Sequence, residues 1–319
     1  MNGNKNLAKI ICIRKIEKRT SIIDYAKNYP EYEKKKFAYF LALPLMDAMA
    51  LWAMFKKGIC KIFKKNLKTN SYFFDGVGSL LKEIKENAAK WRALDIIYNH
   101  IQYIEEKNFK GLEKLVTKFF LGMRNAQAVR NRKKLVALEI SKLIAKIYNE
   151  TKTPVKICSI ASGSAQAVLE GVKIHNIPVK IFLLDINKDA LKHSVKLAKK
   201  EGLESCLVTI RGSATNLEKL FLTIKPDIVE MVGFLDYRPN EKATLLLNRI
   251  YKNMENGSYF LTGNIIPNRE KLFLKAIINW KMIYRKPKKL KEVIEKAGFR
   301  RNNILVESLG IHSIAVCKK

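Results

Sequence analysis

The stretch that decides the fold reads VKICSIASGSAQAVLEGV (155–172), and IFLLDINKDALKHS (181–194) continues it. Each part begins with a short apolar run rich in Ile, Val and Leu. Each run is followed by a segment whose apolar residues recur at helical spacing. Strands that alternate with helices of this length are typical of βαβ units, in which consecutive strands lie parallel. The sequence therefore predicts a parallel sheet that begins at Val155.

The same alternation continues toward the C-terminus. Strands are expected at 155–160, 180–185, 206–210, 227–234 and 259–265, and helices at 165–175, 188–200, 215–222, 241–254 and 288–297. The last two apolar runs, NILVESL (303–309) and HSIAVCK (312–318), are joined through Gly310. Two strands joined this closely must pair antiparallel, because a parallel return needs a long crossover. We expect an α/β fold with five βα units followed by an antiparallel hairpin.

The first half of the chain has a different pattern. Residues 1–150 show no alternation of period two, and apolar residues recur at helical spacing around 80–101 and again over 126–148. Pro154 then ends the helical pattern, because proline restricts the residue before it to extended geometry. We expect an all-helical N-terminal domain over residues 1–150 and a sheet-containing domain over 151–319.

One apolar stretch stands out in the helical half: FAYFLALPLMDAMALWAMF (37–55), with lysines on both sides. It is just long enough to cross a bilayer, but Asp47 lies near its centre and Pro44 beside it. A buried helix pair kinked at Pro44 is the first interpretation. A helix on the membrane surface and a true span are the alternatives.

The net charge of +32 limits the partners that the chain favours. The excess of basic over acidic residues is +17 in residues 1–150 and +15 in the rest, so it is spread evenly. Such a charge favours anionic partners, namely nucleic acid, an anionic membrane surface or a charged substrate. Compositional bias toward lysine explains it equally well.

Cysteine and histidine are too sparse to suggest a disulfide framework or a metal centre. The five cysteines form no CxxC, and no two of the four histidines are spaced as a pair on one helix. Cys158 and Cys206 fall inside expected strands and are predicted to be inert core thiols. We expect no metal, reduced thiols and a cytoplasmic chain that is peripheral at the membrane if 37–55 binds lipid. No secretory signal is recognised at the N-terminus.

The chemistry is expected where the first two strands end. Gly163 lies in a tight turn after the first strand, and Asp185 ends the second strand 22 residues later. An acidic residue at about this distance is placed to hydrogen-bond both hydroxyls of a ribose. The G-x-G-x-x-G fingerprint is absent, which argues against NAD or FAD, and no P-loop occurs. An adenosine-like ligand without a tightly held pyrophosphate is therefore predicted.

With this motif order and the final hairpin, residues 155–319 resemble the class I S-adenosylmethionine-dependent methyltransferase family. The resemblance implies a Rossmann-like, seven-stranded, mostly parallel sheet, S-adenosylmethionine as cofactor and methyl transfer as activity. ICSIASGSA (157–165) matches the family's first motif, which usually has an acid where Ser159 stands and a glycine where Ala165 stands. The missing acid removes a common indirect contact to the methionine amino group.

The resemblance also implies the residues of the cofactor site. The positions carried over are Ala161, Ser162 and Gly163 beneath the methionine part, Asp185 on the ribose, Ile186 beside the adenine, Ser213 and Ala214 at the adenine edge, and Gly233 and Phe234 on the border with the substrate.

Residues outside that pattern have weaker functional interpretations. Asp236 and Tyr237 are weak catalytic candidates, and a solvated or capping acid and a packed tyrosine are the alternatives. His312 is expected to be a structural histidine with satisfied hydrogen bonds. Around 280–285, NWKMIY and the arginine after it are expected to give packed aromatics (Trp280 and Tyr284) and a surface Arg285, or else a substrate contact.

Three functions compete at this point. The first is a methyltransferase for a small-molecule or lipid-like acceptor, over which residues 1–150 would form a cap. The second is an RNA or protein methyltransferase, favoured by the positive charge alone. The third is a cofactor-binding protein that has lost catalysis, suggested by Ser159. The first is preferred, because no NPPY-type tetrad follows the fourth strand and no RNA-binding module is visible in residues 1–150.

Overall fold

The computed structural model describes residues 36–64, 76–214 and 217–319. Within them the chain folds as two compact units. Unit 1 contains Asn131–Ile266 and Ile283–Lys319, and unit 2 contains the described part of Glu31–Arg130 together with Pro267–Met282. The two units are therefore not simply the two halves of the sequence, because a short segment late in the chain belongs to unit 2.

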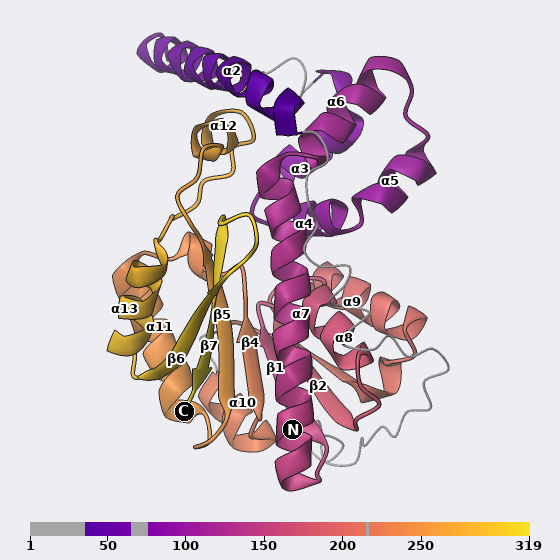
Figure 1. Ribbon diagram of the computed structural model, residues 1–319, viewed down its shortest axis with the longest axis vertical. Helices are drawn as coiled ribbons and strands as arrows, with labels where there is room; N and C mark the ends of the chain where they lie inside the picture. Colours follow the sequence, from indigo (N-terminus) through magenta and orange to yellow (C-terminus); the bar gives the residue numbers. More distant parts are fainter. Residues whose placement is uncertain (1–35, 65–75, 215–216) are drawn as a thin grey trace. The chain divides into compact units, whose positions relative to one another are not determined.

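Unit 1 is built on one seven-stranded sheet with the order β3-β2-β1-β4-β5-β7-β6 (Figure 1). β1 to β5 pair in parallel where they are neighbours, and β7 runs antiparallel to both β5 and β6. This confirms the predicted parallel sheet and its final hairpin. The strands are β1 (Val155–Ile160), β2 (Val179–Asp185), β3 (Leu207–Arg211), β4 (Ile228–Met231), β5 (Tyr259–Ile265), β6 (Arg301–Val306) and β7 (His312–Lys318).

Helices cover both faces of this sheet. One face packs against the later part of α7 (Arg124–Thr151), α8 (Gln166–Lys173) and α9 (Lys188–Lys200). The other packs against α10 (Leu217–Ile224), α11 (Asn240–Asn253) and α13 (Pro287–Lys296), as Figure 1 shows. Strands buried on both faces must be apolar almost throughout, which is why β2 reads VKIFLLD. Two short 3₁₀ turns, η2 (Glu204–Cys206) and η3 (Leu235–Tyr237), complete the connections.

The described part of unit 2 contains helices only. They are α2 (Lys36–Ile62), α3 (Ser79–Glu86), α4 (Trp91–Tyr98), α5 (His100–Lys107), α6 (Gly111–Leu121), the first turns of α7 and α12 (Lys271–Ala276). The predicted helical character of the N-terminal half is confirmed for these residues.

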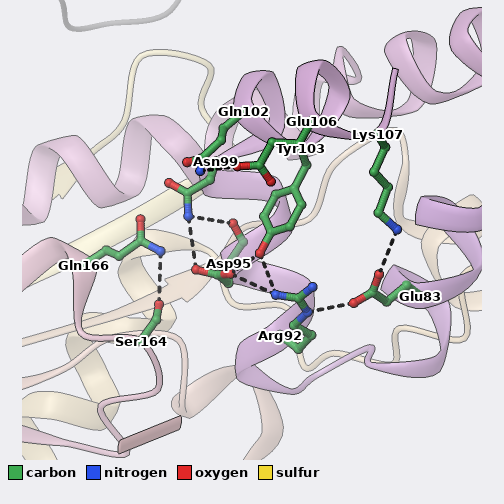
Figure 2. A network of polar contacts seen from close by, with 10 residues as sticks. All are labelled: Glu83, Arg92, Asp95, Asn99, Gln102, Tyr103, Glu106, Lys107, Ser164 and Gln166. Atoms are coloured by element: carbon green, nitrogen blue, oxygen red, sulfur yellow. Dashed lines mark hydrogen bonds and ion pairs between the residues drawn. The ribbon is translucent and has the colours of Figure 1, made fainter. Parts of the chain in front are cut away.

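A buried carboxylate connects the small helices of unit 2. Asp95 of α4 is fully buried and accepts hydrogen bonds from the Tyr103 hydroxyl at 2.8 Å and from the Asn99 side chain at 3.1 Å (Figure 2). Arg92 bridges Asp95 and Glu83, which extends the network to α3. Burial, together with the bond to Asp95, raises the pKa of Tyr103 to about 12, so its hydroxyl remains a donor. The network therefore stabilises the packing of α3, α4 and α5.

A second buried carboxylate explains why residues 267–282 return to unit 2. Glu270, just before α12, accepts hydrogen bonds from the backbone N–H groups of Arg124 and Asn125, each at 3.0 Å. These N–H groups open α7, where a carboxylate satisfies donors that lack a partner within the helix. Tyr39 of α2 donates its hydroxyl to the same carboxylate at 2.7 Å. One side chain thus joins three helices of unit 2.

The apolar stretch at 37–55 differs from its first interpretation. A buried helix pair kinked at Pro44 was expected, but the residues belong to one continuous helix, α2, with Pro44 inside it. Most of its large apolar side chains are exposed, and Leu41 and Trp52 are 65% and 60% exposed. The expectation of burial is therefore wrong, because only a narrow stripe of the helix meets other helices.

Candidate functional site

The loop after β1 has an unusual backbone. Ala161, Gly163 and Ala165 all have positive φ, at 52°, 53° and 54°. This left-handed region costs an alanine roughly 1–2 kcal/mol, whereas glycine adopts it freely. The three alternating residues fold the chain sharply at the carboxyl end of β1. Such a turn allows a ligand to approach the main chain closely.

Asp185 holds this loop in place from the end of β2. One oxygen of its carboxylate accepts the Gly163 N–H at 2.9 Å, and the other accepts the Asn187 N–H at 2.8 Å. On the other side of the loop, Ser194 of α9 donates its hydroxyl to the Gly163 carbonyl at 2.9 Å. Each oxygen of Asp185 can accept one more hydrogen bond. The carboxylate can therefore hold the loop and still receive the hydroxyls of a ligand.

The other residues predicted for the cofactor lie at the same edge of the sheet. Ile186 follows β2 and is 69% exposed, which is unusual for a large apolar side chain beside a buried strand. Ser213 and Ala214 follow β3. Gly233, with a φ of 85°, and Phe234 follow β4. Because β1 to β4 are parallel, their carboxyl ends meet at one edge, where ligands of open α/β sheets bind.

The position that lacks the motif acid has a carboxylate directly beside it. Ser159 of β1 and Glu230 of β4 are register partners, and the Ser159 hydroxyl donates a hydrogen bond to Glu230. The second oxygen of Glu230 accepts the Val232 N–H at 2.8 Å. Burial raises the pKa of Glu230, and the bonds from Ser159 and Val232 and the charge of Arg132 oppose that shift. A carboxyl group therefore lies one strand away from the position where the motif acid is absent.

Arg132 of α7 links this carboxylate to the segment after β4. Its guanidinium lies 3.6 Å from the Asp236 carboxylate, and both side chains are almost completely buried. An added Cβ at Gly233 would lie 3.5 Å from the same guanidinium, which is ordinary van der Waals contact, so the positive φ rather than lack of space favours glycine there. Asp236 also accepts the Ile265 N–H at 2.8 Å, and burial raises its pKa. Asp236 is thus buried, and the alternative of a solvated acid is wrong.

Three further residues were placed by sequence reasoning with mixed results. His312 is 1% exposed, but among the described residues neither of its ring nitrogens has a hydrogen-bond partner. The expectation of a satisfied histidine is therefore wrong. Arg285 was expected at the surface and is 2% exposed, because its guanidinium binds the Leu235 carbonyl and the Asn264 side chain. Trp280 is packed as expected, within unit 2.

Tyr237 and Tyr284 are both half-buried, and Tyr237 ends η3 directly after Asp236. The two cysteines expected in the core, Cys158 and Cys206, are buried. Burial raises the pKa of Cys158 to about 12, so it is inert as a nucleophile.

Sequence reasoning missed Glu230 and Arg132. The signal for Glu230 was available, since it is an acid inside the apolar run IVEM, at a position that alternation directs into the core. Arg132 carried no such signal, because its neighbours Arg130, Lys133 and Lys134 form an ordinary basic run on a helix. The burial of Arg132 depends on how α7 packs against the sheet, which the local sequence does not encode.

The described residues contain no group of three His, Cys, Asp or Glu side chains that could hold a metal ion. They do fit an adenosine-containing ligand, because a positive-φ loop, an available carboxylate and an exposed apolar side chain lie together at one edge.

Most of the chain matches one known protein family. Residues 39–319 match a protein family described as "Putative methyltransferase". Among curated proteins, no sequence matches the chain.

A solved structure supports the fold. A protein from Bordetella parapertussis, described as a possible exported protein, aligns with a TM-score of 0.61 at 15% identity over 86% of this chain and 95% of that one. Two methyltransferases align less well. Magnesium protoporphyrin IX methyltransferase from Synechocystis, with bound SAH, gives a TM-score of 0.47 at 12% identity over 71% of this chain and 98% of that one. Human N-acetylserotonin methyltransferase, in complex with SAM, gives a TM-score of 0.44 at 17% identity over 76% of this chain and 70% of that one.

Proposed function

We propose that the chain, which belongs to this methyltransferase family, transfers the methyl group of S-adenosylmethionine to a small-molecule or lipid-like acceptor. The observation that carries the proposal is the 161–165 loop, held by Asp185 at the carboxyl edge of the parallel sheet. A short positive-φ turn with an acid at the next strand end suits a nucleoside whose far side is an amino acid rather than a pyrophosphate.

Each part of the cofactor has a matching group in this chain. Asp185 would bind the ribose hydroxyls with its remaining acceptor positions, and Ile186 would pack on the adenine. The backbone of Ala161 to Gly163 would lie beneath the methionine part. The remaining sides of the cofactor would be closed by Ser213, Ala214, Gly233 and Phe234, since these residues follow the neighbouring parallel strands.

Glu230, supported by Ser159, takes the place of the acid that the family's first motif usually carries. The two residues are register partners, and their side chains share the face to which Ile157 and Ile228 point. A cationic amino group nearby would favour the ionised form of Glu230 and would offset the effect of burial on its pKa. The departure at Ser159 is therefore compensated, which argues against the catalytically inactive alternative.

The cofactor supplies an activated methyl group, so the protein mainly has to align the acceptor and exclude water. A base is required only when the acceptor carries a proton of high pKa. His312, which lies opposite Ile265 at the carboxyl end of β5, does not suit that role. Burial and the charge of Arg132 lower its pKa well below the usual value, which makes its imidazole a weak base.

Calorimetry of the full chain with S-adenosylhomocysteine and with NAD tests the cofactor. We expect binding of the first and not of the second. Asp185→Ala should weaken binding by about tenfold to a hundredfold, because a hydrogen bond to a charged group contributes roughly 1.5–3 kcal/mol. Asp185→Asn keeps an acceptor for the Gly163 N–H. This variant therefore separates the effect of losing the negative charge from the effect of losing the hydrogen bond that holds the loop. Tighter binding of NAD would overturn the proposal.

An acceptor screen with radiolabelled S-adenosylmethionine decides the acceptor class. Transfer to small molecules or lipids supports the proposal, and labelling of RNA or protein in place of them would favour the alternative that the charge suggests. Cofactor binding without transfer to any acceptor would favour a protein that has lost catalysis.

A further inference from the structure

The exposed face of α2 is the most apolar surface among the described residues. Ten of the exposed large apolar side chains lie between Phe40 and Phe63, whereas the other eight are scattered over the rest of the described chain. Five form a single stripe at helical spacing, with exposed fractions from 39% to 65%: Leu41, Leu45, Trp52, Phe55 and Ile59. Trp52 and Phe55 stack with their ring centroids 5.7 Å apart. A surface of this kind usually marks an interaction site.

The opposite side of α2 is held within unit 2. Its buried residues are Tyr39, Met46, Ala50 and Ala53, and the helix packs against α12. Tyr39 binds Glu270, and Asp47 forms an ion pair with Arg269. These contacts fix which side of the helix points inward. Because these contacts hold the opposite side of α2, the apolar stripe faces away from the rest of its unit.

The charges around the stripe indicate the partner. Lys56, Lys57, Lys61 and Lys64 lie at the C-terminal end of α2 and in the turn after it, and lysines also precede residue 37 in the sequence. Asp47 is the only acidic residue between 37 and 64, and Arg269 neutralises it. The whole chain carries +32. A helix with Trp, Phe and Leu on one face and lysines nearby is typical of helices that lie in the interface of an anionic membrane.

The contacts of α2 favour a helix on the membrane surface over a helix that spans the membrane. α2 is long and apolar enough to cross a bilayer by length and composition, and 22% of its most apolar window is buried. A spanning helix would have to remove Asp47 and its packed stripe from α12 and place that carboxylate in the bilayer core. A helix parallel to the membrane keeps both contacts and still buries the apolar stripe.

We propose that the stripe of Leu41, Leu45, Trp52, Phe55 and Ile59 inserts into the surface of an anionic lipid bilayer, with α2 parallel to the membrane plane. The inference is independent of the methyl-transfer proposal, because it concerns only residues of unit 2 and the lipid. In this proposal the excess positive charge helps to hold α2 at the anionic lipid headgroups.

Sedimentation of the full chain with vesicles tests the proposal. One set of vesicles is phosphatidylcholine alone, and the other is phosphatidylcholine and phosphatidylglycerol in equal parts. We expect stronger binding to the anionic set and release at high salt, since exposed charges are then screened. The emission of Trp52 should shift to the blue on binding and this shift should be absent from Trp52→Phe.

Variants of the stripe identify the contact. Trp52→Gln and Phe55→Gln should each weaken vesicle binding by roughly tenfold or more, because each removes a large apolar side chain from the interface. Both residues are about 60% exposed, so the fold should survive. Leu222→Gln is the matched control, since Leu222 is 72% exposed but belongs to unit 1. Lys57→Gln combined with Lys61→Gln should reduce the preference for anionic vesicles.

Three results would overturn the proposal. One is equal binding to neutral and anionic vesicles. Another is binding that high salt does not release, which would indicate a span. The last is a concentration-dependent dimer, seen by sedimentation velocity without lipid and abolished by Trp52→Gln, which would assign the stripe to a second copy of the chain.

Discussion

At the residue scale, Ser159 and Glu230 mark the departure of this chain from the family's first motif. The acid usually written into β1 is replaced by a serine that hydrogen-bonds an acid on the neighbouring strand. Under the proposed function, Glu230 takes over the role of the motif acid, because adjacent parallel strands bring register partners onto one face.

This pair makes a prediction about ligand parts. Glu230→Gln should weaken the binding of S-adenosylhomocysteine by about tenfold to a hundredfold, because under the proposed function the Glu230 carboxylate binds the cationic amino group of the cofactor. The affinity for 5′-methylthioadenosine, which lacks the amino-acid part, should stay the same. Calorimetry measures both affinities. Glu218→Gln on α10 is the control, since Glu218 is half-exposed and pairs with Arg249 at the surface.

Equal losses for both ligands would show that Glu230 acts on the fold of the site rather than on the amino group. Combining Ser159→Asp with Glu230→Ser moves the acid back to β1. Recovery of S-adenosylhomocysteine affinity in that double variant would support the exchange of roles directly.

His312 makes a prediction about pH. Its pKa in the folded chain lies well below 6.5, while the unfolded chain has the ordinary value. Between these values the unfolded chain binds the proton and the folded chain does not. The free energy of unfolding should therefore fall as the pH drops below about 6.5, by up to ~1.4 kcal/mol per pH unit.

Urea unfolding from about pH 7.5 down to about pH 5.5 measures this effect as the difference between wild type and His312→Gln. The remaining titrating groups, including the half-buried His175, are common to both proteins. Parallel curves for wild type and variant would show that His312 is not held neutral in the fold.

At the element scale, the 161–165 turn carries strain that the sequence does not relieve. Ala165 has a φ of 54° where the family pattern usually has glycine. Ala165→Gly should raise the free energy of unfolding by about 1 kcal/mol, because glycine adopts this geometry without a Cβ penalty. Thermal or urea unfolding measures the change.

The matched control for the turn is Ala145→Gly, at a half-buried position inside α7. There the backbone is helical, so glycine should cost about 1 kcal/mol. Opposite signs for the two substitutions are expected, and destabilisation by both would contradict the strain at Ala165.

At the scale of the whole molecule, the structure changes where a domain can be cut. α7 ends at Thr151, next to the sequence boundary near residue 150, and yet five of its buried apolar residues belong to the core on one face of the sheet: Val136, Ile140, Leu143, Ile144 and Ile147. Burying each contributes about 1.5–3 kcal/mol, so together they reach the size of a domain's whole stability, about 5–15 kcal/mol.

A fragment of residues 151–319 should therefore fail to fold, whereas one of residues 124–319 keeps the core helix. Circular dichroism and S-adenosylhomocysteine binding of the two fragments check this prediction. A cooperative thermal transition of the shorter fragment would show that the sheet does not need α7.

The sequence by itself determined the sheet and the place of the loop. β1, β5, β7 and α9 have the bounds that were predicted, because apolar runs and helical spacing are local properties. Gly163 and Asp185 could be singled out for the same reason, since a turn glycine and a strand-end acid are defined by neighbours in the chain. Their direct hydrogen bond agrees with that pairing.

Only the tertiary structure decided the rest. Glu230, Arg132, Asp236, His312 and Arg285 come from distant segments, and their burial depends on what packs over them. The same holds for α2: its composition allowed a core helix, a span or a surface helix, and only its contacts with α12 show which side is bare. Periodicity reports which residues share a face, but what that face meets is set by chain segments far away in the sequence.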